Sequence, residues 1–326
     1  MMERAILRLV KKHKAFLVTM HVNPDPDALG AALAMALFLR SSGKKVRVIN
    51  DGPCPGWLRF MPQSRLYEVF DATMKFDPDV VVVMDSGDIK RIGRVAQFIR
   101  PGVKVVNIDH HVTNNDFGDY NLVRTELSST SENLYGLLKA AGARLTRDMA
   151  TLLYLGILTD TGSFGFDCTS SHTHQVISEL LKFKLPVSDL YRQVYETMPE
   201  KDLKIFLSLI NTLSLHHGGQ VACLTLTQRQ AARFSDEFDL KDKIFTFLRA
   251  VKGIEVIMIL TQQGAQKTRL NLRSRGVVDV AHFVLPFGGG GHKKASGGVV
   301  ELSLPRSKAL ILEKFEKILP RRGKGA

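Results

Sequence analysis

The chain has 326 residues, of which 44% are hydrophobic and 24% charged, as in a soluble globular protein with room for two domains. Lysine and arginine number 45 against 32 aspartates and glutamates, and the net charge of +13 favours a polyanionic ligand such as a nucleotide or nucleic acid. Three widely spaced cysteines (Cys54, Cys168, Cys223) argue against a disulfide framework or zinc ribbon. Because we also find no signal peptide or membrane-spanning run, we expect a cytoplasmic protein.

The first predicted strand is the apolar run Ala15–Met20, and an Ala- and Leu-rich helix is predicted over residues 28–40. The connecting segment, HVNPDPD, carries His21, Asp25 and Asp27. Prolines favour extended backbone in the residues before them, and residues two apart in extended chain point the same way. We therefore expect the two aspartates to share one face. The alternative is that Asp27 only caps the helix and the prolines only shape a turn.

Three further runs, at Lys45–Asn50, 79–88 and 103–111, are dense in valine and alternate little. Strands of a parallel sheet that is covered on both faces have this composition. The helical segments that follow cover residues 131–141, 147–158 and 172–183. This alternation of strands and helices predicts an α/β fold with a doubly wound parallel sheet.

A second pattern begins after Pro186. A charged, helical stretch leads to predicted strands at 220–227, 254–263 and 267–275, and then to a glycine-rich segment at 286–302. This order predicts a smaller α+β domain joined to the first by a helical linker. The expected limits are 1–187 for the first domain, 188–214 for the linker, 215–320 for the second domain and 321–326 for a basic tail.

Acidic and imidazole side chains stand where the apolar segments end. Asp85 ends the run VVVVM, 109–111 (Asp-His-His) follow VVNI, and Asp160 follows another apolar segment. In open parallel sheets, ligands bind at the carboxyl ends of the strands. Carboxylates gathered there repel one another unless cations lie among them. Two divalent metals meet this need, and the mixture of oxygen and imidazole donors favours Mn²⁺ over Mg²⁺ or zinc. Taken singly, each aspartate is a common turn or cap residue.

These motifs carry a resemblance to a known family. The segments PDPDALG, Asp85, DHH and DTGSF resemble the successive motifs of the DHH phosphoesterase superfamily. RSRGVVDV and FGGGGHKKASGG resemble its DHHA1 domain, so that the two together cover most of the chain. The size and the GGGGH box are similar to those of the NrnA-like group, the bifunctional nano-RNases (oligoribonucleases) and pAp phosphatases. One small departure is Ala31, where many relatives have serine.

The resemblance implies the roles of the site residues. One metal would be held by His21, Asp25 and Asp85, and a second by Asp27, Asp85, His110 and Asp160. Asp85 would bridge the two, Asp109 would orient His110, and His111 would face the substrate phosphate, so that Asp85, Asp109 and His111 form the catalytic set. Two Mn²⁺ ions, with Mg²⁺ and Co²⁺ as alternatives, would lie ~3.5–4 Å apart and activate a water for in-line attack.

The second domain is expected to select the substrate. The glycines of GGGGH offer backbone N–H groups to a phosphate, and Arg273 and Arg275 on a predicted strand can bind phosphate through paired hydrogen bonds. Taken alone, the glycine run is more simply a flexible loop. The expected substrate-binding residues are Arg273, Ser274, Arg275, Gly289, Gly290, Gly291 and His292. The resemblance implies that this domain closes over the metal site and binds the end of a short oligonucleotide.

The expected activity is that of a phosphoric ester hydrolase. It would degrade short oligoribonucleotides to mononucleotides and convert 3′-phosphoadenosine 5′-phosphate (pAp) to AMP. The alternatives are a RecJ-like exonuclease on single-stranded DNA, a phosphodiesterase for pApA or pGpG, an inorganic pyrophosphatase, and a catalytically dead nucleotide sensor. The GGGGH box argues against the pyrophosphatase, and the complete ligand set argues against the sensor. A homodimer is a further hypothesis.

Overall fold

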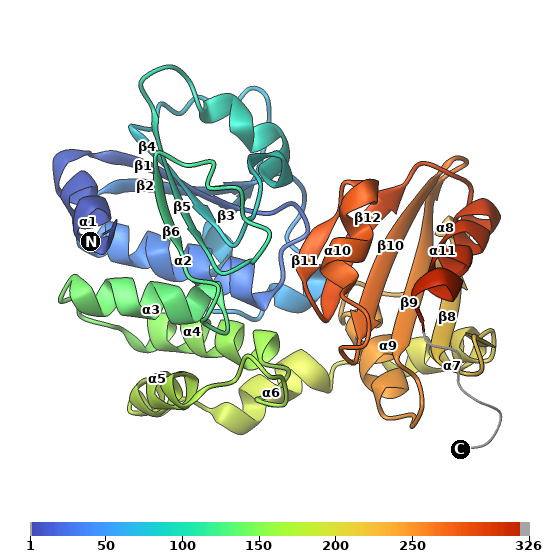
Figure 1. The fold of residues 1–326 in the computed structure, drawn as a ribbon. Helices are drawn as coiled ribbons and strands as arrows, with labels where there is room; N and C mark the ends of the chain where they lie inside the picture. Colours follow the sequence, from blue (N-terminus) through green and yellow to red (C-terminus); the bar gives the residue numbers. More distant parts are fainter. Residues whose placement is uncertain (1, 320–326) are drawn as a thin grey trace. The chain divides into compact units, whose positions relative to one another are not determined.

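The computed structural model describes residues 2–319, which fall into two compact units that divide between Gln193 and Val194 (Figure 1). The expected basic tail, 321–326, lies outside the described residues. The residue limits expected for the two domains and the linker stay a prediction.

The first unit is built on a six-stranded sheet with the order β3-β2-β1-β4-β5-β6, in which every neighbouring pair is parallel. Its strands are β1 (Ala15–Met20), β2 (Lys45–Asn50), β3 (Tyr67–Val69), β4 (Val80–Met84), β5 (Lys104–Asp109) and β6 (Tyr120–Val123). The strand order reverses between β1 and β4, and such a point is where open sheets bind ligands. The predicted doubly wound parallel sheet is confirmed.

Helices cover both faces of this sheet. The helices of this part of the chain are α1 (Met2–Lys12), α2 (Pro26–Ser41), α3 (Thr130–Ala140), α4 (Arg147–Asp160), α5 (Ser171–Leu181), η1 (Gly56–Leu58), η2 (Ser64–Leu66) and η3 (Ile89–Phe98), and α6 (Val187–Tyr195) spans the division between the units; α5 packs on α3 and α4. On one face, α2 lies between the sheet and α4 (Figure 1). On the other, Ile92 and Phe98 of η3 pack with Val81 and Val83 of β4. Because both faces are buried, the central strands need apolar residues at nearly every position.

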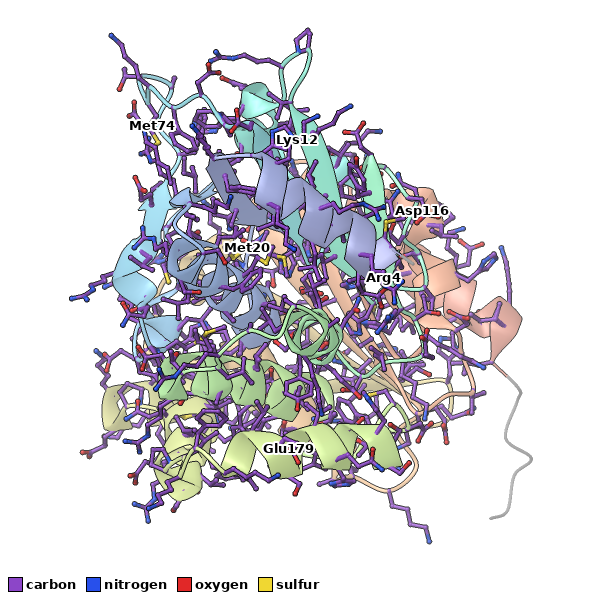
Figure 2. All side chains as sticks on the ribbon, turned by 90° about the vertical axis from the view of Figure 1, so that its left-hand side faces the viewer. Arg4, Lys12, Met20, Met74, Asp116 and Glu179 are labelled. Carbon is purple, nitrogen blue, oxygen red and sulfur yellow. The ribbon has the colours of Figure 1, made fainter. Side chains whose placement is uncertain are left out.

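The α2 helix is buried almost all round and approaches α4 closely. At Gly30 of α2, an added Cβ would lie 2.6 Å from the carbonyl oxygen of Leu152 in α4, so that a larger residue has no room. By contrast, α1 has one exposed face. Figure 2 shows Arg4 and Lys12 on the outside of α1, while Met20 at the end of β1 lies inside the unit.

The second unit is a mixed sheet with the order β11-β12-β10-β9-β8-β7, in which β8 and β9 are parallel and the other pairs antiparallel. Its strands are β7 (Ser214–His216), β8 (Val221–Leu226), β9 (Val256–Gly264), β10 (Lys267–Ser274), β11 (Gly290–His292) and β12 (Ala295–Val300). Its helices are α7 (Glu200–Ile210), α8 (Gln228–Ala231), α9 (Leu240–Arg249), α10 (Val280–Val284), η4 (Leu285–Phe287) and α11 (Leu304–Ile318). The predicted second domain of α+β type is confirmed.

Two cores hold the second unit together, one on each face of its sheet. Met258 of β9 packs in the core that contains Phe315 of α11, and the next residue, Ile259, packs in the core that contains Phe245 of α9. Alternate residues of a strand point to opposite faces, so that this central strand serves both cores.

Two further observations concern the cysteines and the lengths of the helices. Cys54, Cys168 and Cys223 are all free thiols. Within residues 2–319, none of the helices has both the length and the apolar character that crossing a membrane requires.

Candidate metal centre and substrate-binding face

The segment with the two prolines begins a helix instead of staying extended. Helix α2 starts at Pro26, and its N-cap is Asp25, whose Oδ1 accepts hydrogen bonds from the backbone N of Asp27 (3.1 Å) and Ala28 (3.0 Å). Asp25 is extended as expected, but Asp27 lies in the first helical turn. The expectation that both carboxylates are presented by extended chain is therefore wrong for Asp27. The reason is that proline suits the first position of a helix, where its missing N–H would have no intrahelical partner.

A first cluster of metal-binding groups joins His21, Asp25 and Asp85. Nε2 of His21 lies 3.7 Å from Oδ2 of Asp25 and 3.4 Å from Oδ2 of Asp85. One ligand atom from each residue lies within 4.8 Å of the others. Asn50 at the end of β2 supports this cluster, because its Nδ2 donates to the backbone oxygen of His21 at 3.1 Å.

A second cluster joins Asp27, His110 and Asp160 and meets the first at Asp85. Nε2 of His110 lies 3.0 Å from Oδ2 of Asp160, 4.0 Å from Oδ2 of Asp27 and 3.6 Å from Oδ1 of Asp85. Asp85 thus turns one carboxylate oxygen toward His21 and the other toward His110. Its φ of 54° is uncommon for a residue other than glycine, and such backbone strain is concentrated at functional sites.

Asp109 pairs with His111. Its Oδ1 lies 2.7 Å from Nδ1 of His111, whereas the resemblance implied that Asp109 would orient His110. Asn114 supports the pair, because its Nδ2 donates to Oδ2 of Asp109 (2.5 Å) and to Oδ1 of Asn107 (2.8 Å). A carboxylate on Nδ1 fixes the orientation of an imidazole ring, so that Asp109 and Asn114 hold His111 in place.

The start of α3 holds two of these carboxylates, which the sequence did not reveal. The backbone N of Thr130 and of Ser131 donate to the two oxygens of Asp27, at 2.8 and 2.9 Å. The hydroxyl of Thr130 donates to Oδ1 of Asp85 at 2.9 Å. Gly156 of α4 makes room for the arrangement, because a Cβ there would lie 2.5 Å from Oδ1 of Asp27. The serines and threonine before α3 are a recognisable helix-start signal, but that signal does not say what the free N–H groups hold.

The carboxylates change the protonation of the buried imidazoles. Burial alone would lower the pKa of His21, but hydrogen bonds with Asp25 and Asp85 raise it to about 9. Burial likewise opposes the charge on His110, and the hydrogen bond with Asp160 raises its pKa to about 10. Without metal, protonated imidazoles therefore supply the positive charge among the carboxylates.

The pKa values of two carboxylates, Asp85 and Asp27, are shifted in opposite directions. Burial would raise the pKa of Asp85, but the imidazoles of His21 and His111 hold it well below its usual range. The pKa of Asp27 is raised well above its usual range by burial and by the charges of Asp160 and Asp85. The centre thus holds more acidic groups than its imidazoles can neutralise. Its oxygen and imidazole donors fit divalent metal ions, because these ions satisfy both the charge and the ligand types.

In the second unit, the structure places Arg273 and His292 on the same face of the sheet. Ala295 of β12 is the register partner of Arg273 on β10 and of His292 on β11. Residues directly opposite in antiparallel strands project to the same side. The guanidinium carbon of Arg273 lies 4.6 Å from the centre of the Phe245 ring, which gives this side chain a fixed support. Asn271, two residues earlier on β10, belongs to the same face and was not expected from the sequence.

Ser274, the last residue of β10, and Arg275, which follows it, have structural contacts. The Nη2 of Arg275 donates to the backbone oxygens of Arg249 (2.6 Å) and Val251 (3.1 Å), where α9 ends. The hydroxyl of Ser274 accepts from the backbone N of Gly276 at 3.0 Å. Their expected part in substrate binding stays a prediction, and Arg275 also stabilises the end of a helix.

The glycine run is ordered as an edge strand. Residues 290–292 form β11 and pair with β12, so that a flexible loop is not what the structure shows there. A Cβ at Gly289 would lie 2.4 Å from the backbone oxygen of Gly297, and one at Gly291 would lie 2.4 Å from that of Ala295. Gly291 also has a φ of +142°, which side chains rarely allow. These two glycines are needed for the close approach of the two strands.

The parallel sheet with two ligand clusters and the separate mixed-sheet unit define the DHH–DHHA1 class, and two family models match accordingly. Residues 15–157 match the DHH family, N-terminal domain, and residues 225–320 match the DHHA1 domain. The chain belongs to the DHH family, in the NrnA-like group that its motifs predicted.

Three similar proteins cover nearly the whole chain. The bifunctional oligoribonuclease and PAP phosphatase NrnA of Thermus thermophilus is 30% identical over 308 residues, which are 94% of this chain and 90% of that protein. The protein of the same name from Bacillus subtilis is 28% identical over 302 residues, 92% of this chain and 93% of that one. Among solved structures, an exopolyphosphatase-related protein from Bacteroides fragilis has a TM-score of 0.84 at 26% identity and covers 97% of this chain and 96% of its own.

Proposed function

We propose that this protein is a metal-dependent phosphodiesterase and phosphatase that hydrolyses short oligoribonucleotides to mononucleotides and pAp to AMP. The observation that carries the proposal is the position of Asp85, whose two oxygens face two different clusters of metal-binding groups. A shared carboxylate at the carboxyl edge of a parallel sheet is suited to a pair of ions that act on one phosphate. The names of the relatives from Thermus thermophilus and Bacillus subtilis support the substrate class.

Each ligand cluster would hold one ion. The first ion is assigned to His21, Asp25 and Asp85, and the second to Asp27, Asp85, His110 and Asp160. Mn²⁺ is the proposed metal because it accepts both carboxylate and imidazole ligands, with Mg²⁺ and Co²⁺ as alternatives. When bound, two such ions lower the pKa of a water and neutralise phosphoryl oxygens. His111, held by Asp109 beside Asp85, is proposed to orient the phosphate that is attacked.

Substrate capture is assigned to the second unit. Arg273 can bind a phosphate through two parallel hydrogen bonds, and its stacking on Phe245 holds the guanidinium plane ready for this contact. His292 projects from the same face, and the glycines of β11 present no side chains that would block a nucleotide. Ser274, Arg275 and the three glycines Gly289, Gly290 and Gly291 complete the proposed substrate-binding set.

The same residues bear on the alternative activities. A catalytically dead sensor has no need for every ligand of both clusters, and all of them are present. A RecJ-like exonuclease or a phosphodiesterase for pApA or pGpG would use the same metal centre and differ in the nucleic acid held by the second unit. A cytoplasmic location and a homodimer belong to the proposal too. The free thiols support the first, and light scattering would test the second.

A substrate panel tests the function. Purified protein with Mn²⁺ would be given pAp, di- and pentaribonucleotides, a long RNA, single-stranded DNA, pApA, pGpG and pyrophosphate in parallel. We expect rapid hydrolysis of pAp and short RNA, slow hydrolysis of long RNA, and none of pyrophosphate. EDTA should abolish activity, and Mn²⁺ should restore it best. Full activity in the chelator would rule out the two-metal centre, and bound Mn²⁺ without any hydrolysis would favour the sensor.

A further inference from the structure

Thr130, the first residue of α3, contacts two of the clustered carboxylates, those of Asp27 and Asp85. Its backbone N donates to Oδ2 of Asp27 at 2.8 Å, and its hydroxyl donates to Oδ1 of Asp85 at 2.9 Å. All three residues are buried, so that water does not compete for these hydrogen bonds. We propose that Thr130 is a positioning residue that fixes the bridging orientation of the Asp85 carboxylate. This role rests on the proposed function.

The bridge depends on how the Asp85 carboxylate is rotated. One oxygen must face His21 and the other His110, which requires a defined rotation about the bond to the carboxyl group. That rotation has only a broad intrinsic preference in aspartate. A hydrogen bond to one oxygen removes the ambiguity, and the Thr130 hydroxyl makes this bond to Oδ1, the oxygen on the His110 side.

This hydrogen bond is one that metal binding leaves in place. An imidazole that binds a metal through Nε2 is neutral and carries no proton on that nitrogen, so that the ionic contacts of His21 and His110 with Asp85, at 3.4 and 3.6 Å, would be lost. Nδ1 of His111 is already committed to Asp109 at 2.7 Å. The hydroxyl of Thr130 is not a proposed metal ligand, so that it would continue to donate to Oδ1 of Asp85.

The turn that carries Thr130 is itself anchored. Ser129 caps α3 by accepting from the backbone N of Glu132 at 3.0 Å, and the buried carboxylate of Glu132 accepts from the backbone N of Ser128 at 2.9 Å. Asn133 ties the same turn to the sheet, because its Nδ2 donates to the backbone oxygens of Asp109 (3.1 Å) and Leu122 (2.8 Å). Thr130 is therefore presented by a rigid support and not by a mobile loop.

The substitution Thr130→Val tests the proposal, because valine keeps the shape and the backbone N–H but removes the hydroxyl. We expect the affinity for one of two Mn²⁺ ions, measured by calorimetry, to fall about ten- to a hundredfold. The electron paramagnetic resonance spectrum of the Mn²⁺-loaded protein should change, and kcat for short RNA should fall with little change in KM. Thr130→Ser, which keeps a hydroxyl, should restore all three.

Thr151→Val is the matched control, since Thr151 is buried in α4 and its hydroxyl donates only within that helix, to the oxygen of Arg147 at 2.9 Å. It should leave Mn²⁺ binding and kcat unchanged. If Thr130→Val does not fold, Thr130→Ala lacks the same hydroxyl and takes its place. Wild-type affinity and kcat in the variant without the hydroxyl would overturn the positioning role alone. A wild-type protein that bound no Mn²⁺ would overturn both this role and the proposed function.

Discussion

Gly156 offers a direct test of how tightly the proposed metal centre is packed. It lies in the middle of α4, where alanine is ordinarily preferred by about 1 kcal/mol. In this protein, the Cβ of Gly156→Ala would lie 2.1 Å from Oγ of Ser131, 2.8 Å from Cβ of Ser131 and 2.5 Å from Oδ1 of Asp27. The Ser131 hydroxyl can rotate away, but its Cβ is fixed to α3, and Asp27 is held by two backbone N–H groups. We therefore expect the centre to shift.

The expected change in the free energy of unfolding follows from two opposed contributions. Excess volume in a packed interior costs about 1–3 kcal/mol, which exceeds the gain of about 1 kcal/mol from helix preference. Gly156→Ala should thus lower the free energy of unfolding of the metal-free protein, by up to about 2 kcal/mol. Since Asp27 must also move from its two hydrogen bonds, the Mn²⁺ affinity of its cluster should fall about tenfold or more. Urea denaturation and calorimetry measure the two effects.

Gly136→Ala, in the middle of α3, is the matched control. The nearest atom to its Cβ would be Nη1 of Arg124 at 3.4 Å, the mobile end of a side chain. This variant should be as stable as the wild type or more stable, by up to about 1 kcal/mol, with unchanged Mn²⁺ binding. If Gly156→Ala behaves like Gly136→Ala in both measurements, the site around residue 156 is not tightly packed.

Three more predictions concern the metal ligands, the substrate face and pH. Asp85→Ala should be the most damaging ligand change, and a variant that kept about a tenth of the wild-type rate, a loss of only about 1.4 kcal/mol, would contradict the bridging role. Arg273→Ala should raise KM for short RNA about ten- to a hundredfold, with a smaller effect on bis-p-nitrophenyl phosphate. Equal losses of activity on both substrates would mean that Arg273 takes part in catalysis or supports the fold. In the metal-free protein, the pKa of His21 is raised from 6.5 to about 9 and that of His110 from 6.5 to about 10. The protonated imidazoles therefore stabilise the folded state fully below pH 6.5, and this stabilisation is lost as the pH rises through about 9 and about 10. Urea titrations should show the metal-free protein losing stability between pH 6.5 and 10, whereas Mn²⁺-loaded protein, in which both imidazoles stay neutral, should not show this loss.

Of the first sheet, the sequence predicted β1, β2, β4 and β5 and missed the two edge strands. β1 and β2 have the predicted limits; β1 is buried along nearly its whole length, whereas β2 is exposed at Lys45 and half-buried at Arg47. β3 and β6 did not stand out, for they have three and four residues at the sheet edges and are mostly only half-buried. A short edge strand is defined by the neighbour that it pairs with, and this neighbour is not visible in local sequence.

That the proposed metal ligands lie close together was predictable from the sequence, but the contacts that support them were not. The carboxyl ends of parallel strands must meet at one edge, which brings Asp85 and His110 together wherever they lie in the chain. The contact of Thr130 with Asp27 joins residues 103 positions apart through the packing of three helices. No local pattern encodes that contact. The role of Gly156 is equally a property of the assembled structure.

The order of the ligands along the chain has a consequence for folding. His21 follows β1, Asp85 follows β4, His110 follows β5, and Asp160 ends α4, so that neither cluster exists until segments distant in sequence have come together. Such long-range closure is slow and late in folding. Ions held there would connect the separate segments after assembly and would mainly slow unfolding, because the transition state does not yet contain the complete site. Metal binding at the proposed catalytic centre would then also increase the kinetic stability of the first unit.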